Sequence, residues 1–178
     1  MVFKKILVAI DGSSQAQVVF EQALELAQKL GSSLMVFHCV SWESEAQPGS
    51  FVGTLADIDM YCTVQRLQRE RLQKEIEKTL GWLQTYCKQG TSKDIPTEFD
   101  SKVGDPNSQI CDLARTWGAD LIVMGRRGHK GLSEILLGSV SNYVVHHAPC
   151  SVLVLQGLTA PTGDTLALAI ATQANMNG

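Results

Sequence analysis

The stretch FKKILVAIDGSS, residues 3–14, decides the fold class. Residues 3–10 form a short, largely apolar run with β-branched residues near its centre, which is typical of a strand buried on both faces. The tetrapeptide DGSS at 11–14 then breaks the run and supplies side chains that can cap a helix. We therefore expect a buried strand that ends in a turn and leads directly into a helix.

The same alternation of strand and helix continues to residue 155. Gly31 is expected to end the first helix, and Asp105-Pro106 to begin a later one that Gly118 ends. The region 41–61 shows little periodicity and is predicted to be a long loop, and 90–94 a turn. Between them lies a long helix with a predicted inward face of Leu67, Leu72, Ile76, Leu80, Leu83 and Cys87. The expected strands cover residues 3–10, 33–40, 95–103, 119–124 and 150–155.

Strands that alternate with helices indicate a parallel sheet with right-handed crossovers. The sequence therefore predicts one open α/β domain over residues 1–156. Residues 157–178 form a separate C-terminal extension, expected to be a flexible tail, and their apolar run at 166–171 is too short to span a membrane.

Composition narrows the functional class. The 178 residues carry a net charge of -3, so no general basic field attracts nucleic acid or an anionic membrane. The apolar run near the start is too short for a signal peptide, which favours a cytoplasmic location. Five dispersed cysteines without a CxxC pair are typical of reduced, mostly buried thiols. The alternative is one exposed redox-active thiol, at Cys62 or Cys87.

The stretch MGRRGHKGLSEILLGSVS, residues 124–141, is the main site candidate, because ligands of open parallel sheets bind beyond the carboxyl ends of the strands. Gly125, Gly128 and Gly131 allow positive φ angles and close approach of a ligand. Gly138-Ser139 begins a helix, whose free N–H groups favour an anion. Ser141 adds a further hydroxyl donor.

The spacing excludes two common nucleotide motifs. A Walker loop requires Ser or Thr after the lysine, whereas Lys130 precedes Gly131, and no GxGxxG follows the first strand. The observed spacing, G-x2-G-x9-G-S from Gly125 to Ser139, resembles the signature of the ATP-binding branch of the universal stress protein family. The resemblance extends to ILVAIDGS, VFHCV, DLIVMGRRG and APCSVLVL, and so covers most of the chain.

The resemblance implies a five-stranded parallel sheet in the order 3-2-1-4-5, with helices on both faces, and an adenine nucleotide at its carboxyl edge. Asp11 would meet the ribose or a phosphate-bound Mg²⁺, with Ala9 beside the nucleotide, and Val40 would present its backbone to adenine. The ribose side and the phosphate cradle would use Met124, Gly125, Arg127, Gly128, Gly138, Ser139 and Val140. The resemblance also implies a homodimer through the last strand, CSVLVL at 150–155.

Three functions remain open at this point. The first is an ATP-binding regulatory protein of the stress response, whose nucleotide changes its conformation or its protein partner. The second is an enzyme, either a slow ATPase or a phosphoryl or nucleotidyl transferase that uses Asp11 and Mg²⁺. The third is a dimeric scaffold that holds AMP, a cyclic nucleotide or another phosphorylated metabolite at this site.

Several polar residues are expected to have structural roles. His38 is predicted to be a hydrogen-bonded core residue, and His146 and His147 to serve the end of a helix rather than a metal. Asp57 and Asp59 are expected to be solvated rather than to bind a cation.

Overall fold

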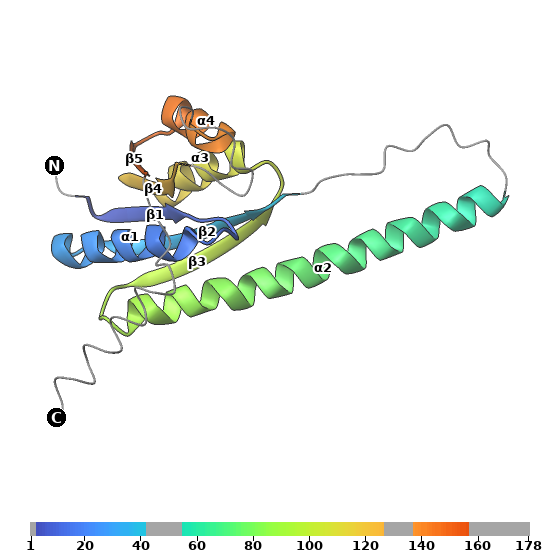
Figure 1. Cartoon of the computed structure of the whole chain (residues 1–178), viewed down its shortest axis with the longest axis horizontal. Coiled ribbons are helices and arrows are strands. Elements are labelled where there is room, and N and C mark those ends of the chain that lie inside the picture. Colours follow the sequence, from blue (N-terminus) through green and yellow to red (C-terminus); the bar gives the residue numbers. More distant parts are fainter. Residues whose placement is uncertain (1–2, 42–54, 127–136, 157–178) are drawn as a thin grey trace.

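The computed structural model describes residues 3–41, 55–126 and 137–156, and the side chains of these residues except for 55–59. The elements in chain order are β1 (Lys5–Ala9), α1 (Ala16–Leu30), β2 (Ser33–Val40), α2 (Leu55–Thr91), β3 (Thr97–Val103), α3 (Pro106–Trp117), β4 (Leu121–Gly125), α4 (Ser139–His147) and β5 (Ser151–Leu155). Figure 1 shows the strands as a single twisted sheet with helices on either side. The predicted alternation of strands and helices is confirmed.

The sheet has the predicted topology. Its strand order is β3-β2-β1-β4-β5, and every neighbouring pair is parallel. β1 lies at the centre, with its residues paired to β2 on one side and to β4 on the other. At the amino-terminal ends of β1 and β4, a carboxylate links the two strands. The Asp120 carboxylate accepts hydrogen bonds from the backbone N–H groups of Lys4 and Lys5 at 2.8 and 3.0 Å.

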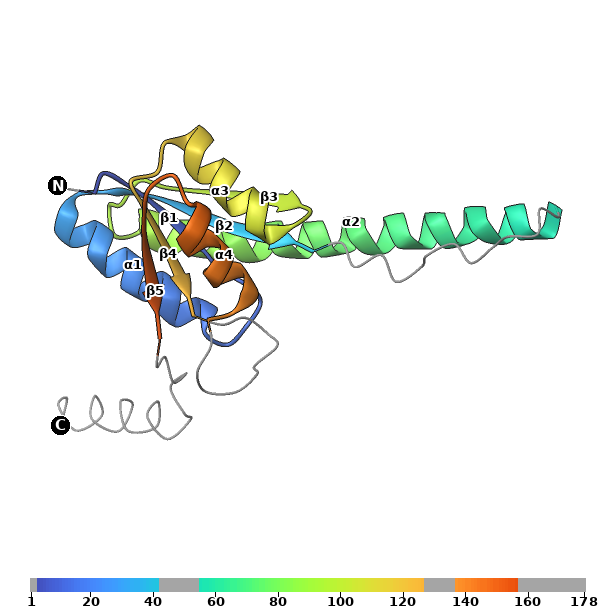
Figure 2. The same ribbon diagram turned by 90° about the horizontal axis from the view of Figure 1, so that it is seen from above.

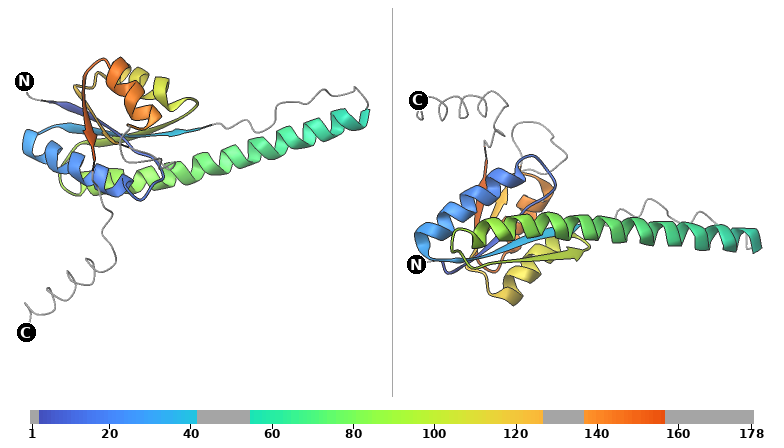
Figure 3. Two further views of the ribbon diagram at one scale, coloured as in Figure 1. Left: turned by 45° about the horizontal axis from the view of Figure 1, so that its top comes forward. Right: turned by 90° about the horizontal axis from the view of Figure 1, so that it is seen from below.

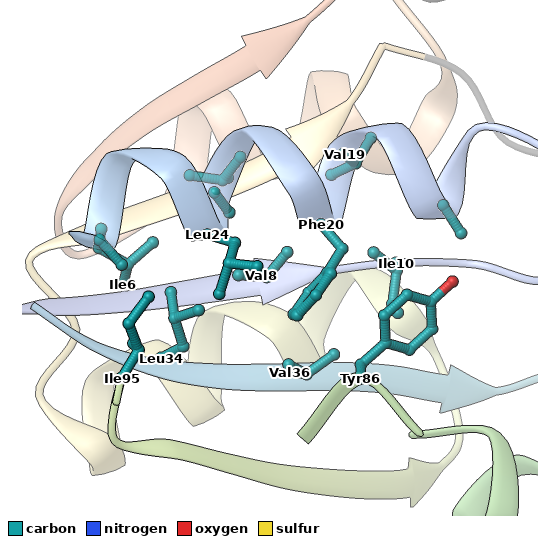
Figure 4. Close-up of a cluster of buried hydrophobic side chains, with 14 of the residues drawn as sticks. Ile6, Val8, Ile10, Val19, Phe20, Leu24, Leu34, Val36, Tyr86 and Ile95 are labelled. Atoms are coloured by element: carbon teal, nitrogen blue, oxygen red, sulfur yellow. The ribbon is translucent and has the colours of Figure 1, made fainter. Parts of the chain in front are cut away.

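Alternating side chains of the central strands build two separate cores. Ile6, Val8 and Ile10 face α1 and α2, whereas Leu7 and Ala9 face α3 and α4. Figure 4 shows the first core, in which Phe20 of α1 and Tyr86 of α2 meet above the sheet, with ring centroids 4.7 Å apart. Because both faces are covered, the continuous apolar run that predicted a doubly buried strand is accounted for.

The long helix differs from the prediction at both ends. α2 begins at Leu55, so residues 55–61 are helical rather than part of a loop, and it continues to Thr91, two residues into the predicted turn. Its predicted inward face is also partly wrong, because Leu67 and Leu80 are exposed. Only the last third of the helix contributes fully buried core side chains, such as Leu83. The spacing of apolar residues predicts a helix, but it does not predict how much of that helix packs against the sheet.

The helix ends are mostly as predicted. Gly31 and Gly118 end α1 and α3 in the left-handed conformation, with φ of 65° and 73°. Asp105 caps α3 by accepting a hydrogen bond from the Ser108 amide at 3.2 Å. The start of α1 is different: Gln15 occupies the cap position, but its side chain does not cap the helix. The Ser13 hydroxyl instead accepts a hydrogen bond from the Gln15 amide at 3.3 Å.

No helix within the described residues has the length and apolar character needed to cross a membrane. α2 is long enough, but it carries many charged side chains.

We predict that Asp105→Ala lowers the free energy of unfolding by about 1 kcal/mol, because the mutation removes the N-cap acceptor of α3. Urea denaturation monitored by circular dichroism measures this change. The matched control is Asp112→Ala, which removes an exposed carboxylate 2.7 Å from Arg115 on the same helix and is expected to cost less than about 0.5 kcal/mol. Equal losses in the two variants would contradict the capping role.

Candidate functional site

The carboxyl ends of β1 and β4 lie side by side at the edge where the sequence places the site. Ala9, the last residue of β1, is paired with Met124 of β4. The strand order reverses between these two strands, since β2 and β3 lie on one side of the pair and β5 on the other. Open parallel sheets bind ligands at such a switch point. The fold therefore brings Ala9, Met124 and the residues that follow them, Asp11 and Gly125, to one edge.

A local turn holds the carboxylate of Asp11 two residues beyond β1. Its Oδ1 accepts hydrogen bonds from the Ser13 amide at 3.2 Å and from the Ser13 hydroxyl at 2.5 Å. The residue is half-buried. A side chain fixed in this way loses little further rotamer entropy when it meets a ligand, which is the condition for a pre-organised polar contact.

The backbone of Arg126 joins three elements beneath the site. Its N–H donates to the carbonyl of Leu155 in β5 at 2.8 Å. Its carbonyl accepts from the Gly138 N–H at 2.9 Å, and the Ser141 hydroxyl lies 2.8 Å from the same oxygen. These contacts fix where α4 begins relative to β4 and β5.

The first turn of α4 presents backbone N–H groups that its cap residue, Gly138, does not cap with a side chain. Gly138 occupies the cap position with an extended backbone and without a side-chain hydrogen bond. Ser139 is exposed and Val140 is half-buried. The first N–H groups of a helix have no partner within the helix, and the dipole places positive partial charge there. This end of α4 therefore has the donors and the potential that suit an anion.

Val40 ends β2, next to Gly104, which the sequence analysis missed. The Val40 carbonyl accepts a hydrogen bond from the Gly104 N–H at 3.0 Å, and the thiol of Cys39 lies 3.4 Å from the Gly104 carbonyl. Gly104 has a φ of 145°, which favours glycine. The signal in the sequence is the glycine that directly precedes the Asp105-Pro106 start of α3.

The structure corrects two details of the predicted glycine and serine roles. Gly125 does not adopt a positive φ, which is found only at Gly31, Gly104 and Gly118 among the described glycines. Ser141 is buried, and its hydroxyl lies against the carbonyls of Arg126 and Gly138, so it supports the helix start instead of facing a ligand. Arg127, Gly128 and Gly131 lie outside the described residues.

Two of the histidines, His38 and His147, have structural contacts of the kind that the sequence predicts. His38 Nδ1 lies 2.9 Å from the carbonyl of Ile10, and its ring meets Trp82 edge-on. His147 Nδ1 lies 2.8 Å from the Tyr143 carbonyl, and the two rings are stacked. Over the described part of the chain, no group of three or more His, Cys, Asp or Glu residues could hold a metal ion.

Comparison with known proteins identifies the family. The model of the universal stress protein family matches residues 2–156. The chain belongs to the universal stress protein family. It is 43% identical over 158 residues to the universal stress protein Sll1388 of Synechocystis, a match that covers 88% of this chain and 99% of the relative.

Solved structures of universal stress proteins share the fold. The UspA protein of Lactobacillus plantarum matches with a TM-score of 0.73 and 25% identity, over 88% of this chain and 99% of that one. A family protein of Arabidopsis thaliana, solved with AMP bound, matches with a TM-score of 0.58 and 21% identity, over 85% of this chain and 90% of that one. The family's five-stranded sheet and its strand order are therefore those of this chain.

We predict that Ser141→Ala lowers the free energy of unfolding by about 1 kcal/mol, because the Arg126 carbonyl loses a buried hydrogen-bond donor. Thermal and urea denaturation measure the loss. Ser139→Ala, two residues away on the exposed surface, provides the matched control and is expected to leave stability within about 0.5 kcal/mol of the wild type. The supporting role of Ser141 is wrong if both variants unfold alike.

The thiols are predicted to differ sharply in reactivity. Burial, with a smaller contribution from the Asp105 carboxylate, raises the pKa of Cys39 to about 11, so this thiol remains protonated at pH 8. Cys62 is exposed on α2. At pH 8, iodoacetamide followed by peptide mass spectrometry should therefore label Cys62 and leave Cys39 unmodified until the protein is unfolded. Early labelling of Cys39 would contradict its placement behind Gly104.

Proposed function

We propose that this protein binds an adenine nucleotide at the carboxyl edge of β1 and β4, and that nucleotide occupancy changes its conformation or its choice of protein partner. The observation that carries the proposal is the first turn of α4, which begins at a glycine cap without a side chain and which the Arg126 carbonyl holds beside the end of β4. Backbone N–H groups in this arrangement favour phosphate oxygens. We assign residues 1–156 to this nucleotide-binding domain.

We assign a part of the nucleotide to each predicted contact residue. The phosphates would lie on the N–H groups and hydroxyl of the α4 start, at Gly138, Ser139 and Val140, with Arg127 and Gly128 contributed by the preceding segment. The ribose would lie against Met124 and Gly125, near Ala9. These assignments follow the spacing of the family motif.

The adenine would lie near the end of β2. A carbonyl oxygen can accept two hydrogen bonds, and among the described residues that of Val40 accepts one, from the Gly104 N–H. The second acceptor position would serve the adenine amino group. Gly104 therefore joins Val40 in the proposed adenine contact.

ATP is the nucleotide that we propose first, because the G-x2-G-x9-G-S spacing resembles the ATP-binding branch of the family. Mg²⁺ commonly binds through one or two carboxylates together with substrate phosphates, and Asp11 supplies one carboxylate at this edge. The cation would then arrive with the nucleotide. The AMP of the Arabidopsis protein supports the broader class of adenine nucleotides, although at 21% identity that likeness establishes the fold alone.

Dimerisation through residues 150–155 is part of the same proposal. β5 forms an edge of the sheet, where its outer backbone groups are available for pairing with a second copy. The Arg126 N–H bond to Leu155 would connect such a pairing to the nucleotide site.

We predict that Gly138→Val weakens ATP binding by about two orders of magnitude, or roughly 2.7 kcal/mol, as measured by isothermal titration calorimetry. Gly138 has φ -60° and ψ 156°, which other residues adopt without strain, so the variant is expected to fold. The loss would come from a side chain placed where the phosphates approach the backbone.

Asn142→Ala, one turn further along α4, is the control and should bind as the wild type does. Unchanged affinity in Gly138→Val, with circular dichroism confirming that it is folded, would overturn the site. Mass spectrometry of the ligand released from purified protein then distinguishes ATP from AMP, ADP or a cyclic nucleotide.

A further inference from the structure

α2 is much longer than the sheet against which it packs. Its 37 residues span about 55 Å at 1.5 Å per residue. The longest strand, β2, has 8 residues and spans about 26 Å. Figures 1 and 2 show the amino-terminal half of the helix extending beyond the other described helices and strands, and Figure 3 shows the same extension from two further directions. We call residues 55–78 of this helix the arm.

The arm exposes large apolar side chains close together. Met60 is 60% exposed and Leu67 is 46% exposed, and Tyr61 and Val64 are also exposed. By contrast, Leu83 and Tyr86 of the same helix are buried against the sheet. Most helices in proteins depend on packing of an apolar face for their stability. A helix that leaves the domain with its apolar residues in water therefore indicates a missing partner surface.

Three of the exposed apolar residues, Met60, Val64 and Leu67, belong to a heptad pattern that continues with basic residues. Met60, Val64, Leu67, Arg71, Lys74 and Lys78 are alternately four and three residues apart, and we call this set the seam. Such alternation keeps side chains on one stripe of a helix and is the repeat of a coiled coil. At about 100° per residue, the seam lies roughly a quarter turn from the face buried at Thr79 and Leu83, so packing on the sheet leaves the seam accessible.

We propose that the seam pairs with the seam of a second copy of this chain in an antiparallel coiled coil. The charges decide the direction. A parallel pair in register would set Arg71, Lys74 and Lys78 each against its own copy, and like charges in the core layers oppose pairing. An antiparallel pair avoids this, because the basic end of each arm then meets the apolar end of the other.

The register that centres the apolar residues sets Val64 against Leu67 of the second copy, in two symmetric layers. Arg71 then lies over Met60, where its methylene stem can cover the thioether while the guanidinium reaches water. In the sequence, the heptad position before Met60 is Asp57, and the same register assigns it to Lys74 of the second copy. The seam is thus complementary to itself, as a two-fold interface requires.

The positions that flank the seam are compatible with this register. Tyr61 would lie beside Gln68, and Thr63 beside Glu70, so no like charges are opposed. α2 packs on β2 and β3, whereas β5 is the opposite edge of the sheet, so the arm contact does not compete with pairing through β5. The inference is also independent of nucleotide binding.

Disulfide trapping tests the contact and its direction. In a Cys62→Ser background, Val64→Cys and Leu67→Cys chains are prepared separately, mixed and mildly oxidised, and cross-linked peptides are quantified by mass spectrometry. The antiparallel register predicts that the mixture forms the 64–67 disulfide between chains, about tenfold more than either chain forms with itself. Self-cross-linking of each chain as efficient as the mixed product would overturn this register in favour of a parallel one. No cross-link at either position would overturn the pairing and assign the seam to another surface.

A charge variant provides an independent readout by sedimentation velocity. Val64→Glu places a carboxylate in the central layer, and since Glu has a higher helix propensity than Val, the arm itself is not weakened. We expect its association constant to fall by about tenfold or more. Gln84→Glu adds the same charge at an exposed position outside the seam and should assemble as the wild type does. Identical concentration dependence of the mass in both variants would overturn the proposal.

Discussion

Burial of both faces of β1 is the constraint on which the rest of the structure depends. A strand whose side chains alternate between two apolar environments needs a layer of helices on each side. Ile6 and Val8 require α1 and α2, and Leu7 and Ala9 require α3 and α4. With neighbours hydrogen-bonded on both edges, β1 must also be central. The two helical layers and the central position therefore follow from one apolar run.

The candidate site is a consequence of the same constraint. The carboxyl ends of β1 and β4 are paired, but the chain leaves β1 toward α1 and β4 toward α4, on opposite faces of the sheet. The segments that follow these strands therefore diverge, and polar groups can enter between them. The Arg126 backbone then sets how α4 enters this edge, through Gly138, Ser141 and Leu155. The buried Ser141 hydroxyl thus helps to fix the start of α4, where the exposed Ser139 lies. Ser141, which is buried, holds the helix start in place, and Ser139, which is exposed, is available for the proposed phosphate contact.

α2 extends from the region that covers the sheet into a region where it covers no described strand. Its carboxyl-terminal part packs on β2 and β3, and Leu83 and Tyr86 enter the core. Its amino-terminal part has no strand beneath it, yet it remains apolar at Met60 and Leu67. The same helix therefore serves the fold at one end and presents a surface at the other.

The sequence by itself determined the strand and helix order, the doubly buried strands and the glycine ends of α1 and α3, because these depend on local periodicity and on backbone preferences. The resemblance of its motif to a known family also predicted the strand order. Tertiary structure alone decided that Ser141 faces inward, that Gly104 meets Val40, and that Leu67 is exposed. The physical reason is that burial of a residue depends on which distant segment covers it. The local spacing of apolar residues does not identify that segment.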